Sequence, residues 1–204
     1  MRLWWSSRSP YVRKVTVALA ELGLTDQVEL VPVTVSQRSP QANPGLACVN
    51  PMVTIPTLQF DDGSVLAEST LICLALEDRF GSGVLVPSEG PARQDVLART
   101  AAGGLMIDAA MQLRLYLGMN AANLAERIAG YRWKLEHALD AAERSRPASP
   151  EKADLGSISL CVALAYFDFR LPEIQWRAGR PELSAWHDVI AARPSFASTE
   201  FRNG

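Results

Sequence analysis

The segment at residues 50–69, NPMVTIPTLQFDDGSVLAES, limits the possible folds of this chain more than any other stretch. Two short apolar runs, Thr57–Phe60 and Val65–Leu66, flank Asp61-Asp62-Gly63, which is typical of a tight turn because glycine accepts a positive φ. The second run leads directly into Glu68-Ser69, where a helical pattern begins. The segment therefore predicts a β-hairpin followed at once by a helix.

The same segment offers groups that could bind the end of a peptide. Pro56 stands directly before the first strand, which favours a cis Ile55–Pro56 bond, the alternative being an ordinary proline at a strand edge. The peptide group of Ile55 would face outward and could pair with an extended peptide as an added strand. Glu68 and Ser69 would add a carboxylate, a hydroxyl and the N–H groups of a helix start, unless they serve only to begin the helix.

Strand and helix patterns alternate over residues 1–80. Ser9-Pro10 is the preferred order of an N-cap and a first helical residue. Besides the hairpin, the expected elements are a strand at Arg2–Trp5, a helix from Pro10 that stops at Gly23, a strand at Val28–Val35, a mostly irregular stretch at Ser36–Val49 and a helix at Ser69–Phe80. This order, β-α-β followed by β-β-α, predicts a small α/β thioredoxin-like domain.

Residues 81–90, GSGVLVPSEG, read as a linker because they contain three glycines and a proline without a period. Strand alternation is absent from residues 91–204. Their helical patterns cover Pro91–Gly118, Ala121–Arg144, a largely apolar stretch from Ser157, its expected N-cap, to Arg170, and Pro181–Ala192. We therefore predict a second, all-α domain built as a helical bundle.

Composition narrows the range of partners. Lys and Arg number 20 against 22 Asp and Glu, so bulk charge gives no reason to expect a nucleic acid. Cys48, Cys73 and Cys161 are far apart, with no C-x-x-C and no nearby histidine, which argues against a metal site or a disulfide framework and suits a reducing compartment. No apolar run reaches ~18 residues and none resembles a signal peptide. We expect a soluble, cytoplasmic protein without a membrane partner.

Three segments resemble the glutathione S-transferase family. The hairpin segment matches its pattern of an aliphatic-proline pair, a hairpin and an acidic-serine pair. The opening SSRSPYVRKVTVALAELGL is similar to the family's first β-turn-α unit, and the later SISLCVALAYFDFRLPEIQWRAGRPELSAWHDVIAARPSF is similar to two of its late helices. The resemblance covers nearly the whole chain. It implies a thioredoxin-like N-terminal domain, an all-α C-terminal bundle and a homodimer.

The resemblance also implies roles for single residues. The hydroxyl of Ser9, or alternatively that of Ser7, would contact the sulfur of glutathione and favour its thiolate. The residues that would hold the rest of glutathione are Ile55, Pro56, Glu68, Ser69, Thr54 and Arg38. The last two are candidates because many members have Gly-Lys, with the lysine on the glycine carboxylate, where this chain has Val53-Thr54. Gln37 is the alternative to Arg38 as the missing donor. The pocket for the second substrate would be lined by Tyr11, Met106, Met111 and Arg114, although such residues are often plain core.

The activity implied by the resemblance is the transfer of glutathione. Its thiolate would attack a small hydrophobic electrophile, with glutathione as co-substrate and no metal or redox cofactor. The Val53-Thr54 departure favours an alternative, a non-catalytic glutathione-binding or protein-interaction module with the same fold. A thiol–disulfide oxidoreductase is a third possibility, and a serine at the helix start, where that chemistry needs cysteine, counts against it.

Overall fold

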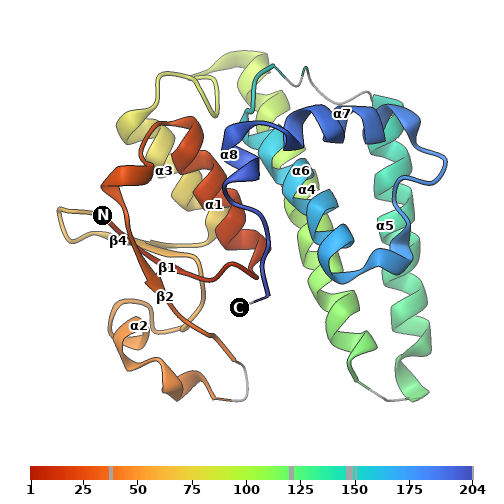
Figure 1. The fold of residues 1–204 in the computed structure, drawn as a ribbon, viewed down its shortest axis with the longest axis horizontal. Coiled ribbons are helices and arrows are strands. Elements are labelled where there is room, and N and C mark those ends of the chain that lie inside the picture. Colours follow the sequence, from red (N-terminus) through yellow and green to blue (C-terminus); the bar gives the residue numbers. More distant parts are fainter. Residues whose placement is uncertain (37–38, 120–121, 146–148, 150, 204) are drawn as a thin grey trace.

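The computed structural model of the chain describes residues 1–36, 39–119, 122–145, 149 and 151–203 (Figure 1). Its first part contains β1 (Arg2–Trp5), α1 (Pro10–Glu21), β2 (Glu29–Pro32), α2 (Pro44–Val49), β3 (Thr57–Gln59), β4 (Val65–Ala67) and α3 (Ser69–Phe80). Its second part contains α4 (Gly90–Leu117), α5 (Ala125–Ser145), α6 (Leu155–Arg170), α7 (Pro181–Ala191) and α8 (Pro194–Ala197). The chain thus has the predicted class, a small mixed sheet with helices followed by a helical bundle.

The four strands form one sheet in the order β2-β1-β3-β4. β1 runs parallel to β2, and the pairs β1–β3 and β3–β4 are antiparallel. β2 (Glu29–Pro32) lies at an edge of the sheet, so the missing N–H of Pro32 costs no hydrogen bond to a strand on its outer side. The strand is shorter than the predicted Val28–Val35. Helices α1 and α3 pack together on one face of the sheet, and α2 lies toward the other (Figure 1).

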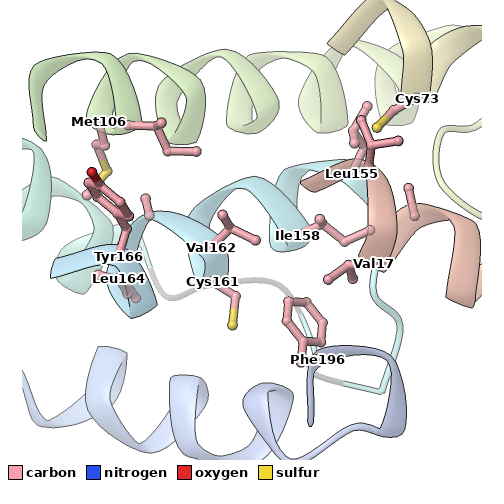
Figure 2. Packing of buried hydrophobic residues seen from close by; sticks show 14 of the residues in the cluster. Val17, Cys73, Met106, Leu155, Ile158, Cys161, Val162, Leu164, Tyr166 and Phe196 are labelled. Carbon is pink, nitrogen blue, oxygen red and sulfur yellow. The ribbon is translucent and has the colours of Figure 1, made fainter. Parts of the chain in front are cut away.

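Successive side chains of β1 point to opposite faces of the sheet, and each face has its own apolar core. Leu3 is fully buried in the main core, whereas Trp4 packs with Leu46 of α2 and with Val53. The main core continues from α1 and α3 into the second part of the chain, where α6 is buried on most of its surface (Figure 2). Because the apolar faces of both parts meet in one cluster, the bundle holds α1 at a fixed place relative to α4 and α6.

Residues 81–89, between α3 and α4, form a packed connection. The carboxylate of Glu77 accepts hydrogen bonds from the N–H groups of Gly83, at 2.5 Å, and Leu85, at 2.7 Å. Leu85 is fully buried and its carbonyl accepts a 2.8 Å bond from the N–H of Leu155, the first residue of α6. This segment is therefore part of the main core, through the buried side chain of Leu85.

The structure corrects two features of the helical patterns. The helical pattern predicts that Leu71, Leu74 and Ala75 of α3 face inward. Leu74 and Ala75 do pack against the core, beside the buried Ile72, Cys73 and Leu76, but Leu71 is 52% exposed. We also expected Ser157 to cap the helix of the apolar segment. Asp154 caps it instead, accepting a 2.8 Å bond from the N–H of Ser157, so α6 begins one turn earlier than predicted.

Gly103 allows α4 and α6 to approach each other closely. A Cβ at Gly103 would lie 2.6 Å from the carbonyl carbon of Ser159 and 2.7 Å from its Cβ. The neighbouring Gly104 has no atom within 4 Å of the equivalent position. Although glycine lowers helix propensity, the pair Gly103-Gly104 lies within one continuous helix, and the first glycine is required by packing.

We predict opposite effects of alanine at these two neighbouring glycines. Gly103→Ala should lower the free energy of unfolding by about 1–3 kcal/mol, because the added methyl group forces the backbones of α4 and α6 apart. Gly104→Ala should raise it by up to about 1 kcal/mol, since alanine favours a helix and finds open space. Urea denaturation of both variants checks this, and equal effects at the two positions would contradict the close approach.

Candidate functional site

Three segments that are distant in the sequence meet at one edge of the sheet. The register places Trp4 of β1 beside Thr57 of β3, and Thr57 beside Ala67 of β4. Because both pairs are antiparallel, the end of β1, the start of β3 and the end of β4 lie together. The residues that leave the sheet at this edge are the loop at residues 6–9, Ile55-Pro56 and Glu68-Ser69. Tertiary pairing thus assembles the candidate glutathione-binding residues.

The Ile55–Pro56 peptide bond is cis, as the sequence predicted. A short network of side chains holds the turn around it. Asn50 donates from Nδ2 to the hydroxyl of Thr54 at 3.0 Å and to that of Thr57 at 2.9 Å, and the Thr57 hydroxyl donates to the carbonyl of Thr54 at 2.8 Å. Thr54 is therefore engaged in this turn. Its exposed side chain lies at the same sheet edge as Ile55.

Glu68 caps the helix that follows it. Its carboxylate accepts hydrogen bonds from the N–H groups of Thr70, at 2.9 Å, and Leu71, at 3.0 Å, and from the hydroxyl of the buried Ser69, at 3.2 Å. Two of the helix N–H groups that we expected to meet a ligand are thus already occupied. The side chain is exposed, and a carboxylate has about four acceptor positions, so it retains capacity for one further donor.

Two electrostatic effects act on this carboxylate. Burial raises the pKa of Glu68, but the N–H groups of Thr70 and Leu71 and the charge of Lys14 outweigh it, so that the pKa is lowered. Glu68 also has a φ of 78°, which is uncommon for a residue other than glycine. A non-glycine residue is thus held in this conformation, with its carboxylate ionised, at the sheet edge.

Lys14 and Arg13 of α1 are both buried, although basic side chains on a helix are usually exposed. Lys14 is 2% exposed and donates from Nζ to the hydroxyl of Thr70 at 2.9 Å, which ties α1 to the first turn of α3 behind Glu68. Burial lowers the pKa of Lys14, and the charge of Glu68 is among the groups that oppose this. Sequence reasoning missed this support because basic residues on a helix are usually exposed.

The two candidate serines differ in the bonds that they make. Ser9 caps α1, and its Oγ accepts a 3.3 Å hydrogen bond from the N–H of Val12. The hydroxyl of Ser7 donates to the carbonyl of Arg202 at 3.1 Å. Among the residues that the structure describes, none accepts the proton of Ser9. Ser9 therefore combines a helix N-terminus with a hydroxyl proton that remains available.

The comparisons with known proteins agree with this geometry. Residues 8–79 match the family model described as the glutathione S-transferase N-terminal domain. A solved glutathione transferase family member from Pseudomonas fluorescens Pf-5, with bound glutathione, is 34% identical over 99% of both chains, with a TM-score of 0.91. The chain belongs to the glutathione S-transferase family. A second structure from that organism contains S-(propanoic acid)-glutathione, with 33% identity over 100% of both chains and a TM-score of 0.88.

A relative without an assigned activity is also similar. The Escherichia coli K12 protein named uncharacterized GST-like protein YibF is 26% identical over 98% of both chains. Membership of the glutathione S-transferase family, with its thioredoxin-like and all-helical parts, is therefore established by sequence and by structure together.

Within this family member, Val53 adopts a backbone conformation that suits glycine. Its φ is 52°, and a β-branched residue in this region is an outlier. Val53 stands at the glycine of the Gly-Lys pair that many transferases have. Its side chain is 9% exposed and packs against Trp4 and Leu46, so burial of apolar surface offsets the backbone strain. A backbone conformation that favours glycine is therefore occupied here by a buried valine.

The four residues predicted to line the second-substrate pocket lie in different surroundings. Met106 is 4% exposed and belongs to the core beside Tyr166 (Figure 2), so its prediction as a pocket wall is corrected. Tyr11 donates from its hydroxyl to Asp108 at 2.6 Å, which joins α1 to α4. Met111 is partly buried, and its sulfur accepts a 3.0 Å bond from Tyr166. The fourth residue, Arg114, is exposed on α4.

Arg38, predicted to meet glutathione, lies outside the described residues.

A cavity of about 260 Å³ lies between β1, α1 and residues 198–202, and Ser7 and Arg13 are among its lining residues. No residue of the hairpin segment lines it. This cavity is therefore separate from the sheet edge, although the loop at residues 6–9 borders both.

Neither a membrane helix nor a cluster of metal ligands is found in the described part of the chain. No helix there is long and apolar enough to cross a bilayer. No group of three or more histidine, cysteine or acidic side chains is placed there to hold a metal ion.

Proposed function

We propose that this protein is a glutathione transferase in which the thiolate of glutathione, bound at this sheet edge, attacks a small hydrophobic electrophile. The carbon–sulfur bond forms as the leaving group departs with its electron pair, and the thiol proton passes to solvent. The observation that supports this proposal is the convergence of Ser9, Ile55 and Glu68 at one sheet edge. Glutathione is the co-substrate, and the chemistry requires no metal or redox cofactor.

The three segments suit three parts of glutathione. Glu68 presents a lowered pKa and spare acceptor capacity to an ammonium group, and Ser69 adds a hydroxyl. The peptide group of Ile55 faces the cysteinyl portion as an added strand. Ser9 donates its hydroxyl proton to the sulfur, and the N-terminus of α1 adds a favourable field for a thiolate. Thr54 is the candidate contact for the glycine carboxylate.

The solved relatives support the proposal. The Pseudomonas fluorescens proteins bind glutathione and S-(propanoic acid)-glutathione, a molecule in which the sulfur carries a substituent. If this chain binds the same way, the sheet edge accepts both the tripeptide and an adduct on its sulfur.

Calorimetric titration of glutathione together with a turnover assay with 1-chloro-2,4-dinitrobenzene tests the proposal. Binding with turnover above the uncatalysed rate supports the transferase. Binding without turnover on several electrophiles supports the second candidate, a non-catalytic module, which the Val53-Thr54 departure favours. Absence of binding contradicts both.

A thiol–disulfide exchange activity is not supported by the cysteines. Burial raises the pKa of Cys73 to about 12 and that of Cys161 to about 12, so neither is a thiolate at neutral pH. Cys48 is exposed but lies in α2, away from the start of α1. The three thiols are free, which suits a reducing compartment and supports a cytoplasmic location.

We predict that Glu68→Gln and Ser69→Ala each weaken glutathione binding by about tenfold or more, because each removes a group from a charge-assisted contact with the γ-glutamyl end. Glu68→Gln keeps an oxygen that can accept from the helix N–H groups, so its stability should change less than its affinity. Calorimetry with thermal unfolding on the same samples measures both. A variant that binds glutathione like the parent would reduce that residue to a helix-start role.

We also propose a homodimer. Leu71 of α3 and Leu105 of α4 are 52% and 68% exposed, and apolar side chains at these positions could meet a second copy. Light scattering should give twice the mass of the chain, and Leu105→Glu should shift the protein toward the monomer. A parent protein that is monomeric at micromolar concentration would contradict the proposal.

A further inference from the structure

The cavity behind the loop at residues 6–9 is bounded by both ends of the chain. Helix α8 packs against α1, and the chain after it runs back toward the end of β1 (Figure 1). Two hydrogen bonds fix it there: the Ser7 hydroxyl donates to the carbonyl of Arg202 at 3.1 Å, and the N–H of Arg202 donates to the carbonyl of Ser7 at 3.4 Å. The cavity of about 260 Å³ lies between this C-terminal segment, α1, β1 and β2.

The wall of the cavity is mostly apolar. Its hydroxyl groups are largely engaged within the protein, since Thr16 donates to the carbonyl of Arg13 at 3.1 Å and Thr199 to that of Ser195 at 2.8 Å. The volume is slightly below the range of about 300–1,000 Å³ that is usual for ligand pockets, so it suits a molecule with about one aromatic ring. The apolar side chains that line it are Trp5, Val12, Leu19, Ala20, Val28 and Leu30.

Arg13 brings a buried guanidinium to this wall. The residue lines the cavity and is 7% exposed. Its Nη2 donates to the carbonyl of Phe196 at 3.1 Å, and the guanidinium lies 4.6 Å from the centre of the Phe201 ring. A guanidinium has several N–H donors, yet this is the only hydrogen bond that it makes to the described residues, and its buried Nε has no partner among them. Arg13 therefore keeps donor capacity beside an apolar cavity.

The charge of Arg13 is not balanced by a carboxylate. Among the described residues, no Asp or Glu forms an ion pair with it. Burial lowers the pKa of Arg13, and the charge of Glu200 is among the effects that oppose this. Glu200 and Arg202 also line the cavity and are both exposed, so two positive charges stand against one negative charge. A buried cation without a counterion is costly, and an anion beside it would offset that cost.

We propose that this cavity is a second binding site and that its ligand is a small organic acid. The carboxylate of the ligand accepts hydrogen bonds from the guanidinium of Arg13, and its apolar body lies against the apolar wall. No residue of the hairpin segment lines the cavity. The site is therefore distinct from the sheet edge that is proposed to hold glutathione, and it does not depend on the transferase function.

The wall and the charge together select this class of ligand. A neutral apolar molecule would use the wall but would leave the guanidinium of Arg13 without an anion. An inorganic anion would pair with Arg13 but would gain nothing from the apolar side chains. A molecule with one carboxylate and one apolar body uses both, which gives it the highest affinity of the three.

Phenylacetate and phenylacetamide test the site because they share one shape and differ in charge. In calorimetric titrations the parent should bind the acid about tenfold more tightly than the amide. Arg13→Gln should bring the two dissociation constants to within about twofold, and Arg13→Lys should retain part of the preference because it keeps the charge. Arg2→Gln is the matched control, since it removes an exposed arginine at the other end of β1 and should leave the preference unchanged.

A variant that fills the cavity tests the place of binding without altering Arg13. Ala20 of α1 lines the cavity and is partly buried, so the ring added in Ala20→Phe should weaken the binding of both probes by about tenfold or more. Ala141→Phe adds the same ring at an exposed position of α5 and should change neither affinity. Thermal unfolding of every variant shows whether a loss of binding is a loss of the folded protein.

The outcomes separate this site from the sheet edge. With saturating glutathione present, the dissociation constant of phenylacetate should stay within about threefold of its value without glutathione. A constant that rises in proportion to the glutathione concentration would place the acid at the sheet edge and overturn the inference. A parent that binds neither probe, equal affinities for the acid and the amide, or undiminished binding by Ala20→Phe would overturn it as well. A parent that does not bind glutathione contradicts the proposed function alone, because the probe titrations need no glutathione.

Discussion

Replacement of Ser9 by alanine is expected to slow glutathione transfer at neutral pH by up to about 10²-fold, the effect of removing one preorganised donor to a developing or resident anion. The proton of the Ser9 hydroxyl has no acceptor among the described residues, while its oxygen caps α1. The variant should raise the pKa of the bound thiol, because a thiolate loses its donor. The thiolate absorbance of the complex, followed against pH, measures this directly.

A loss of the helix cap must be separated from a loss of the donor. Ser9→Gly serves this purpose, since glycine in place of serine at an N-cap costs only a few tenths of a kcal/mol and carries no side-chain donor. Both variants should therefore raise the midpoint of thiol titration, and Ser9→Ala should lower the free energy of unfolding further, by about 1 kcal/mol. An unchanged midpoint in both would reduce Ser9 to a cap. A raised midpoint in Ser7→Ala instead would move the role to Ser7.

Replacement of Asp154 by alanine is expected to cause the largest loss of stability among the substitutions considered. The carboxylate accepts two hydrogen bonds from Arg99 of α4, at 2.9 and 2.7 Å, and one from the N–H of Ser157. Alanine removes the helix cap and leaves a partly buried guanidinium without its main partner. We expect a loss of about 3 kcal/mol in the free energy of unfolding, or about 6–12 °C in Tm.

Asp95 provides the matched control for this ion pair. It also contacts Arg99, at 2.9 Å, but is 66% exposed, so Asp95→Ala should change the free energy of unfolding by less than about 1 kcal/mol. Urea denaturation of the two variants compares them. Similar losses in both would show that the cap and the buried pair at Asp154 contribute little.

The pH dependence of stability follows from the same carboxylate. Burial raises the pKa of Asp154, but the bonds from Arg99 and from the N–H of Ser157 outweigh it, and the pKa is lowered. A lowered pKa in the folded state gives stability that is complete above the unfolded pKa, about 4, and that is lost as the pH falls through the folded value. The difference in stability between the parent and Asp154→Asn should therefore be constant near neutrality and shrink below about pH 4. A difference that is unchanged at low pH would contradict the ion pair.

Much of the fold could be predicted because its signals are local. The order Ser9-Pro10 places a helix start where it is observed, and the hairpin turn depends on a glycine with a φ of 83° at Gly63. The helix at Ser69–Phe80 has the observed bounds. Each of these features is decided by a few adjacent residues, so the sequence alone determined most of the elements, their order and the candidate residues of the sheet edge. It did not predict α2 (Pro44–Val49), which lies in a stretch expected to be mostly irregular.

Features that depend on the packing of distant residues could not be predicted. Lys14 and Arg13 follow a helical pattern that would normally expose them, and only the approach of α3 and of the C-terminal segment buries them. Helix propensity alone makes Gly103 unfavourable, and only the close approach of α6 gives this glycine a packing role. The cap of α6 shifted from Ser157 to Asp154 because Arg99, 55 residues away, binds the carboxylate.

The candidate site divides in the same way. The sequence alone indicated most of the residues predicted to meet glutathione, because they lie in one continuous hairpin segment and at one helix start. The tertiary structure alone decided which charged group supports the site, since Lys14 of α1 donates to Thr70 of α3, behind Glu68, only once the two helices pack together. The physical reason is that a charge is read from the sequence as exposed and solvated, whereas its role depends on which other charges the fold places around it.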